Sequence, residues 1–147
     1  MSKYFGIGIY NPKFDKNIGI LWRSAYLLGA AYIFILNGKH YKYSSDTQKT
    51  WKQIPCYEWK NLNIPVNAKL IGVETSKVYP KAIDLPDFKH PTFATYILGN
   101  ESKGLPLEIL NQCDACINIP CVKEQSYNVS MAGTLVMYDR YTKEKKK

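Results

Sequence analysis

Three short polar clusters interrupt apolar stretches of this 147-residue chain, and their residue types could carry chemistry. The first runs from Asn17 to Arg23, the second is Asn100-Glu101, and the third runs from Ser126 to Ser130. Together they supply a guanidinium, a carboxylate, amides and hydroxyls, which are groups that bind phosphate or transfer protons. Taken singly, each cluster is also explained by local structure, because Asn and Ser commonly cap helix starts.

The first cluster leaves two interpretations open. Asn17 precedes a stretch that reads as a helix from Ile20 to Gly29, so its side chain is placed to cap that helix. Arg23 stands about one turn inside this helix, among apolar neighbours. Its long side chain can extend to solvent. A partly buried Arg23 would instead need an anionic partner, such as a carboxylate or a phosphate.

The second cluster lies in a loop that follows a β-rich run and could be mistaken for a nucleotide-binding loop. Gly99 and Gly104 have the spacing of a phosphate-binding P-loop, but Leu105-Pro106 stand where that loop needs Lys and Ser or Thr. The dinucleotide fingerprint is matched only by Gly6-Ile-Gly8, which lacks the third glycine. The sequence therefore supports neither kind of phosphate site.

Strands alternate with helical segments along the chain, which predicts an α/β fold with a mainly parallel sheet covered by helices on both faces. Residues 1–147 read as one domain with a basic tail at about 143–147. A short helix capped by Asp46 or Thr47 is expected to end at Trp51, and residues 75–91 are expected to be mostly loop. The predicted strands are 3–10, 31–36, 57–62, 69–74, 92–98 and 115–119, and the other predicted helices are 20–29, 106–112 and 129–142, the last capped by Ser126 or Asn128.

The composition favours a polyanionic partner. The net charge is +8, and the lysine-rich tail contributes much of the excess. The 12 tyrosines and 3 tryptophans could stack on nucleic-acid bases or fill the core. No apolar run approaches the length of a membrane span, and residues 1–4 lead into a strand without the apolar core of a signal peptide. We therefore expect a soluble, cytoplasmic protein.

The four cysteines raise the question of a metal site. Cys113 and Cys116 have a zinc-like C-x-x-C spacing, and Cys121 follows nearby. A structural zinc site needs four ligands, whereas His40 and His90 show no paired spacing. Reduced, unpaired cysteines are the better interpretation for a cytosolic protein, and we expect no metal.

In combination, the three clusters resemble the three signature motifs of the SpoU (TrmH-like) family of the SPOUT methyltransferases. The motifs stand in the family's order, and the resemblance spans nearly the whole chain. Tyr127 occupies a position that is usually aliphatic in the family. The motifs are Asn17-x-Gly-x-x-x-Arg23, Leu98-Gly-Asn-Glu101-x-x-Gly104-Leu-Pro106, and Ile119-Pro120 followed by Ser126-x-Asn128-Val-Ser130-x-Ala132.

The resemblance implies an RNA 2′-O-ribose methyltransferase that uses S-adenosyl-L-methionine on tRNA or rRNA. It also implies a C-terminal deep trefoil knot, a rare exception among folds, and a homodimer with the active site near the interface. The extent of the chain resembles the family's minimal members, which favours tRNA. The alternatives are a knotted RNA-binding module without catalysis and a zinc-binding protein.

The resemblance also assigns roles to individual residues. Arg23 would be the catalytic residue, either as the base or as a group that orients the hydroxyl and a phosphate. Asn17, Glu101 and Asn128 would orient Arg23 or the substrate, and Ser130 would support them. The cofactor would be bound by Val73, Glu74, Leu98, Gly99, Ile119, Ser126 and Tyr127.

Overall fold

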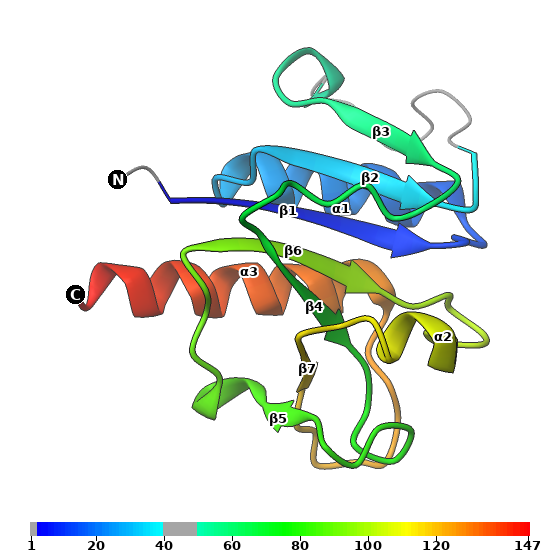
Figure 1. Cartoon of the computed structure of the whole chain (residues 1–147), viewed down its shortest axis with the longest axis vertical. Helices are drawn as coiled ribbons and strands as arrows, with labels where there is room; N and C mark the ends of the chain where they lie inside the picture. Colours follow the sequence, from blue (N-terminus) through cyan, green and yellow to red (C-terminus); the bar gives the residue numbers. More distant parts are fainter. Residues whose placement is uncertain (1–2, 40–49) are drawn as a thin grey trace.

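The computed structural model describes residues 3–39 and 50–147, and a twisted parallel sheet runs through this part of the chain (Figure 1). Neighbouring strands follow the order β3-β2-β1-β6-β4-β7-β5. Every strand pair is parallel. The predicted α/β class is thus confirmed. The strands are β1 (Tyr4–Tyr10), β2 (Tyr32–Leu36), β3 (Cys56–Trp59), β4 (Lys69–Val73), β5 (Ile83–Asp84), β6 (Phe93–Leu98) and β7 (Ala115–Asn118).

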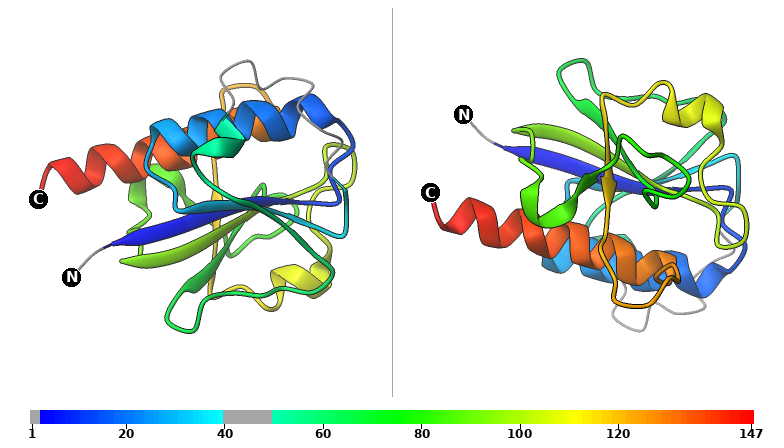
Figure 2. Two further views of the ribbon diagram at one scale, coloured as in Figure 1. Left: turned by 90° about the horizontal axis from the view of Figure 1, so that it is seen from above. Right: turned by 90° about the horizontal axis from the view of Figure 1, so that it is seen from below.

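Two long helices lie side by side on one face of the sheet. They are α1 (Asp15–Leu27) and α3 (Val129–Lys145), and Figure 2 shows both on the same side. The opposite face carries the short helix α2 (Leu107–Leu110) and connecting segments. Helices therefore cover both faces, as predicted, but very unequally. Two 3₁₀ turns complete the described elements, η1 (Thr50–Lys52) and η2 (Leu85–Asp87).

The first strand shows how the sequence builds two different faces. Phe5, Ile7 and Ile9 are buried in the core between the sheet and the α1–α3 layer. Gly6, on the other face, lies under the ring of Tyr32, where an added Cβ would come within 2.1 Å of the ring. The missing side chain therefore lets this ring lie flat across the sheet.

A buried polar cluster ties α3 to the amino-terminal end of the sheet. The Arg140 guanidinium donates to the carbonyls of Pro91 and Thr92 and to the Tyr96 hydroxyl. The His90 ring contacts the Tyr96 hydroxyl at 2.6 Å and the Asp139 carboxylate at 2.8 Å. Burial lowers the pKa of His90 despite its hydrogen bond to Asp139, and burial raises the pKa of Tyr96 to about 12. The cluster lies far from the polar motifs and serves packing.

Several predicted boundaries differ from the structure. Helix α1 begins at Asp15 and not at Ile20, so Asn17 lies within its first turn and does not cap it. The expected loop 75–91 contains β5 and η2. Pro106 is the N-cap of α2, and the prediction for residues 46–51 falls largely outside the described residues. Asn128 caps α3, which settles the choice between it and Ser126.

Candidate functional site

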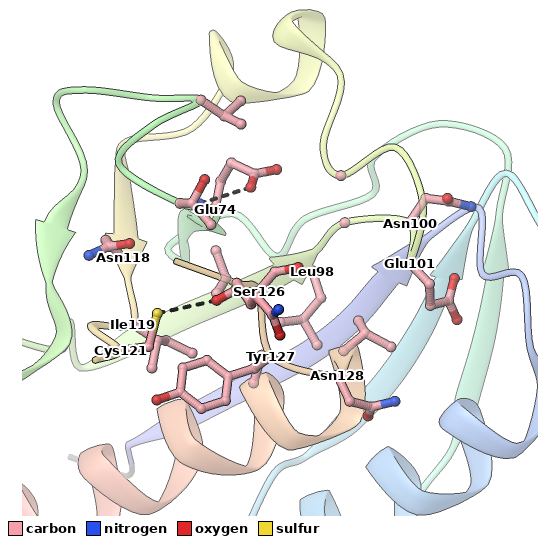
Figure 3. A pocket seen from close by; sticks show the side chains of 18 of the residues that line it. Glu74, Leu98, Asn100, Glu101, Asn118, Ile119, Cys121, Ser126, Tyr127 and Asn128 are labelled. Carbon is pink, nitrogen blue, oxygen red and sulfur yellow. Dashed lines mark hydrogen bonds between the residues drawn. The ribbon is translucent and has the colours of Figure 1, made fainter. Parts of the chain in front are cut away.

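A cavity of about 980 Å³ lies at the carboxyl ends of β4, β6 and β7, beside the start of α3 (Figure 3). Such edges are where open parallel sheets bind ligands. Ten of the eleven predicted site residues line it. They come from distant parts of the sequence: Asn17, Val73, Glu74, Leu98, Gly99, Glu101, Ile119, Ser126, Tyr127 and Asn128.

One wall of the cavity is the loop from Gly99 to Gly104. The backbones of Asn100 and Gly104 exchange two hydrogen bonds, of 3.1 and 2.8 Å, and Gly104 has a positive φ of 67°. The Asn100 side chain accepts the N–H groups of Ser102 and Lys103. An added Cβ on Gly99 would lie 2.5 Å from the Gly104 carbonyl carbon. The loop is therefore a closed turn in which Gly99 is required by the loop's own backbone.

The side chain of Asn17 joins the three motifs. Its Nδ2 donates to Glu101 Oε1 at 2.9 Å, and its Oδ1 accepts from Asn128 Nδ2 at 3.1 Å. The Ser130 hydroxyl is 3.5 Å from the same Oδ1 and 2.5 Å from Asn128 Oδ1. Asn17 is buried, so losing these partners would leave a polar group unsatisfied. The network fixes the side chains of residues that are up to 113 positions apart.

Glu101 also holds the start of α1 against the loop. Its two carboxylate oxygens accept the backbone N–H groups of Lys13 at 2.7 Å and Phe14 at 3.3 Å. Partial burial acts to raise the pKa of Glu101, but hydrogen bonds from Asn17 and from these N–H groups outweigh it and lower the pKa. The carboxylate therefore stays ionised and is suited to orienting groups rather than to donating a proton.

The opposite wall is the segment from Pro120 to Asn128. The Tyr127 hydroxyl donates to the Pro120 carbonyl at 3.0 Å, which closes this segment into a loop. The Cys121 thiol contacts the carbonyls of Lys123 and Gln125. Figure 3 shows the Tyr127 ring beside Ile119 and Cys121, with Ser126 above it. The loop thus presents an aromatic ring and backbone groups to the cavity.

Glu74, at the end of β4, connects the cavity wall to the Gly99–Gly104 loop. One carboxylate oxygen accepts the Thr75 N–H at 2.8 Å, and the other accepts the Leu105 N–H at 2.9 Å. Val73 and Leu98 supply buried apolar surface next to it. The Glu74 carboxylate therefore braces the turn while it borders the cavity.

Arg23 is the predicted site residue that the structure places elsewhere. Its side chain is exposed on α1 and does not line the cavity of its own chain. It stands between Ile20 and Leu27, which are 42% and 65% exposed. Helical spacing puts these three residues on one face. Arg23 therefore belongs to an exposed, partly apolar surface, and its predicted role depends on what covers that surface.

The structure adds cavity residues that the sequence did not single out. Asn118, at the end of β7, accepts the Ser76 N–H at 3.1 Å and donates to Asp84 at 2.7 Å. Lys77 forms an ion pair with Glu124 at 3.0 Å, across two loops of the rim. Asn118 could have been identified from the sequence, since it is a polar residue at the carboxyl end of a buried strand. The Lys77–Glu124 contact could not have been identified in this way, because it joins residues 47 positions apart.

The cysteines do not gather into a metal site. Within residues 3–39 and 50–147, no group of three or more His, Cys, Asp or Glu side chains is placed to hold a metal ion. Cys113 and Cys116 flank Gly72, and burial raises their pKa values to about 11 and about 12. Cys121 lies apart from them, in the Pro120–Asn128 loop. Separately, none of the described helices is both long and apolar enough to cross a membrane.

Comparisons with known proteins identify the family of the chain. The model of the SpoU rRNA Methylase family matches residues 5–138. The tRNA (guanosine(18)-2'-O)-methyltransferase TARBP1 of Mus musculus is 27% identical over 142 residues, which are 87% of this chain and 9% of that protein. The tRNA (guanosine(18)-2'-O)-methyltransferase of Borreliella burgdorferi is 27% identical over 134 residues, which are 84% of this chain and 60% of that protein. The chain thus spans only part of the length of these relatives.

A solved structure gives the same fold. The SpoU methyltransferase AviRb from Streptomyces viridochromogenes, in complex with AdoMet, superposes with a TM-score of 0.86 at 19% identity. The match covers 100% of this chain and 63% of AviRb. At this identity the likeness establishes the architecture of the chain.

Proposed function

Because this chain belongs to the SpoU rRNA Methylase family, we propose that it transfers a methyl group from S-adenosylmethionine to a ribose 2′-hydroxyl of RNA. The observation that carries the proposal is the convergence of three separate sequence motifs on one cavity, where Asn17, Glu101 and Asn128 form a continuous hydrogen-bonded network. Helix capping alone would not require a buried Asn17 that bonds to two other motifs.

The cavity suits a cofactor with an aromatic base and polar ends. Its volume of about 980 Å³ lies at the upper end of the range of ligand pockets, which is about 300–1,000 Å³. Leu98, Ile119 and Tyr127 offer apolar and aromatic surface, and Ser126 adds a hydroxyl. S-adenosylmethionine, when bound, supplies a methyl group activated by a sulfonium. Val73, Glu74 and Gly99 complete the proposed binding set.

Glu101, Asn17 and Asn128 are proposed to hold the substrate ribose in line with the cofactor. Their hydrogen bonds lock the three side chains before any substrate arrives, so little ordering is left for the binding step. Ser130 supports Asn128 from within α3. Alignment of reacting groups can supply roughly 7–11 kcal/mol of the barrier reduction, more than a general base usually contributes.

We further propose a homodimer in which Arg23 of one subunit serves the cavity of the other. Arg23 does not line its own cavity, yet it shares an exposed face with Ile20 and Leu27. Neighbouring α3 adds the exposed side chains of Met131 and Tyr138. Exposed apolar side chains on two neighbouring helices are what an interface would cover. The planar arginine guanidinium offers paired N–H donors that match a phosphate, so we assign Arg23 to orienting the hydroxyl and a phosphate.

Mixed dimers test the role of Arg23. Arg23→Ala should abolish methyl transfer while titration calorimetry still detects S-adenosylmethionine binding. Ile119→Arg should block the cofactor but keep Arg23. If Arg23 acts across the interface, mixing the two inactive variants restores activity, because the mixed dimer combines one intact cavity with one intact arginine. No recovery from dimers shown to be mixed would overturn the proposal that Arg23 acts across the interface.

The reaction itself is tested with radiolabelled S-adenosylmethionine and total RNA. We expect label in RNA, with tRNA favoured by the names of the two relatives. A 2′-O-methyl group blocks alkaline cleavage of the adjacent phosphodiester, so the label should appear in alkali-resistant dinucleotides. RNA binding without label would instead favour a knotted, non-catalytic RNA-binding module.

The remaining proposals concern the chain path. We propose that residues 1–147 form one methyltransferase domain and that its C-terminal part is threaded into a trefoil knot. The order of the sheet supports this, since β6 separates β1 from β4 and β4 separates β6 from β7. The Lys77–Glu124 ion pair supports it too, because it brings the segment before α3 against the loop that follows β4.

A further inference from the structure

A second hollow, of about 290 Å³, lies at the β3 edge of the sheet, on the face opposite α1 and α3. We refer to it as the aromatic groove, and it has no residue in common with the cofactor cavity. Figure 1 shows β3 beside β2 at this edge. The groove is lined by Tyr4, Tyr32, Tyr57, Trp59, Asn63 and Pro65.

The floor of the groove is rigid. Tyr32 lies flat over Gly6, which has no side chain to displace it, and its hydroxyl bonds to Thr95 at 2.8 Å. The Trp59 ring stacks on Phe34, with centroids 4.3 Å apart and an interplanar angle of 18°. Both rings are therefore fixed by the packing of the sheet and stay in place without a ligand.

Tyr57 is the open wall of the groove. It is 47% exposed, although it stands on a strand. Its ring is nearly parallel to that of Trp59, at 10°, with centroids 6.3 Å apart, and its centroid is 5.9 Å from that of Tyr32. Such a large aromatic side chain usually loses more of its surface to neighbours. The groove thus offers a partly solvated ring beside a fixed aromatic floor.

We propose that the aromatic groove binds an unpaired nucleobase of the RNA substrate, an inference that rests on the proposed function. Flat bases stack on aromatic side chains, and single-stranded RNA is recognised largely in this way. The Asn63 amide can both donate to and accept from a base edge. The charge is also complementary to RNA, because exposed Lys3 and Lys60 adjoin Tyr4 and Trp59 in the chain and the net charge is +8.

The location predicts what the groove does. Tyr57 pairs with Phe34 of β2, Phe34 with Gly8 of β1, and Gly8 with Ile97 of β6, so Tyr57 lies three strands from β6. Three strand spacings of about 4.8 Å make roughly 14 Å across the sheet. A base in the groove therefore belongs to a nucleotide several positions from the methylated one. The groove should strengthen RNA binding and lower KM without changing kcat.

Three substitutions of Tyr57 separate stacking from simple burial. Tyr57→Phe keeps the ring, Tyr57→Leu keeps an apolar side chain, and Tyr57→Ala removes both. The probe is a fluorescein-labelled ten-nucleotide single-stranded oligoadenylate, titrated at one fixed salt concentration and followed by anisotropy. We expect the Phe variant to bind like the wild type, and the Leu and Ala variants about 5-fold to 100-fold more weakly.

Two control measurements exclude indirect effects of the Tyr57 substitutions on folding and on the cofactor cavity. All variants should keep the thermal midpoint of the wild type within a few degrees and an unchanged affinity for S-adenosylmethionine. Equal oligoadenylate affinity for the wild type and the folded Ala variant would overturn the inference. So would a loss of self-association in the Ala variant with RNA binding intact, since the groove would then be an interface between copies. Failure of the proposed function would appear separately, as RNA binding by the wild type without methyl transfer.

Discussion

The hydrogen bond between Asn17 and Glu101 predicts how a substitution of Asn17 would change the free energy of unfolding and its dependence on pH. Asn17→Asp keeps the shape of the side chain but replaces the amide donor by a carboxylate oxygen. In the wild type this donor lies 2.9 Å from Glu101 Oε1. The variant therefore loses a hydrogen bond to a charged group, worth about 1.5–3 kcal/mol, and places two acidic groups in contact.

The size of the stability loss follows from the proton that the carboxyl groups at positions 17 and 101 must share in the variant. Two carboxylates at this separation would repel by several kcal/mol even at an effective dielectric constant of about 20. Holding one proton at pH 7 on a carboxyl of ordinary pKa, near 4, costs about 4 kcal/mol at about 1.4 kcal/mol per pH unit. Glu101 is partly solvated, which weakens the repulsion. We expect Asn17→Asp to lower the free energy of unfolding by about 2–4 kcal/mol at pH 7.

The sign of the pH dependence distinguishes this variant from an ordinary loss of contact. The lowered pKa of Glu101 stabilises the wild type above the usual carboxyl range, and this stability is lost as the pH falls. In the variant, repulsion between the two carboxylates raises the pKa of the pair, so stability is lost as the pH rises. Urea unfolding at pH 5, 6, 7 and 8 should show the deficit growing with pH, by at most about 1.4 kcal/mol per unit.

Asn17→Ala is the control, since it removes the hydrogen bond to Glu101, together with those from Asn128 and Ser130, without adding an acid. Its deficit should stay constant between pH 5 and pH 8, with the protein concentration held fixed because the chain is proposed to dimerise. A deficit of the Asp variant that is equally flat across this range would refute the reasoning. It would mean that residues 17 and 101 are not in shielded contact.

Three further predictions concern single positions. Gly99→Ala should lower the thermal midpoint as well as cofactor affinity, because the new Cβ meets the backbone of Gly104 within the same loop; calorimetry with and without S-adenosylmethionine checks both. Burial lowers the pKa of His90, so its contribution to stability is present above pH 6.5 and should fall as the pH drops below this value, by less than about 1.4 kcal/mol per pH unit. Urea unfolding should show that this slope flattens in His90→Gln. Arg140→Ala should cost about 3–5 kcal/mol in the same assay, because it leaves the part-buried Pro91 carbonyl and the Glu144 carboxylate without this partner and removes one of the two donors to the Thr92 carbonyl.

The structure changes the expectation for the glycine loop in particular. The family resemblance places Gly99 against the cofactor, so a side chain there would be expected to collide with it. The nearest atoms are instead those of Gly104 and Leu105, so any side chain first disturbs the loop. A loss of cofactor binding in such a variant would therefore not by itself place Gly99 against the cofactor.

The sequence alone was sufficient for the class of fold and for naming ten residues that line one cavity. Buried strands read as continuous apolar runs, and polar residues that interrupt them at strand ends stand out. The resemblance to the SpoU family then named ten residues that share one cavity. These signals are local, since each depends on residue types within a few positions. That is why β1, β4, β6 and the last helix were located within a few residues.

Only the tertiary structure decided how those residues act on one another. Glu101 holds the two residues before α1 and thereby helps to set a helix start that local capping rules placed five residues later. Asn17 is the centre of a network rather than a cap, and Arg23 does not line the cavity of its own chain. The roles of Glu101 and Asn17 depend on contacts between segments about 80 to 110 positions apart. Local propensity contains no information about which distant partner a polar side chain will meet.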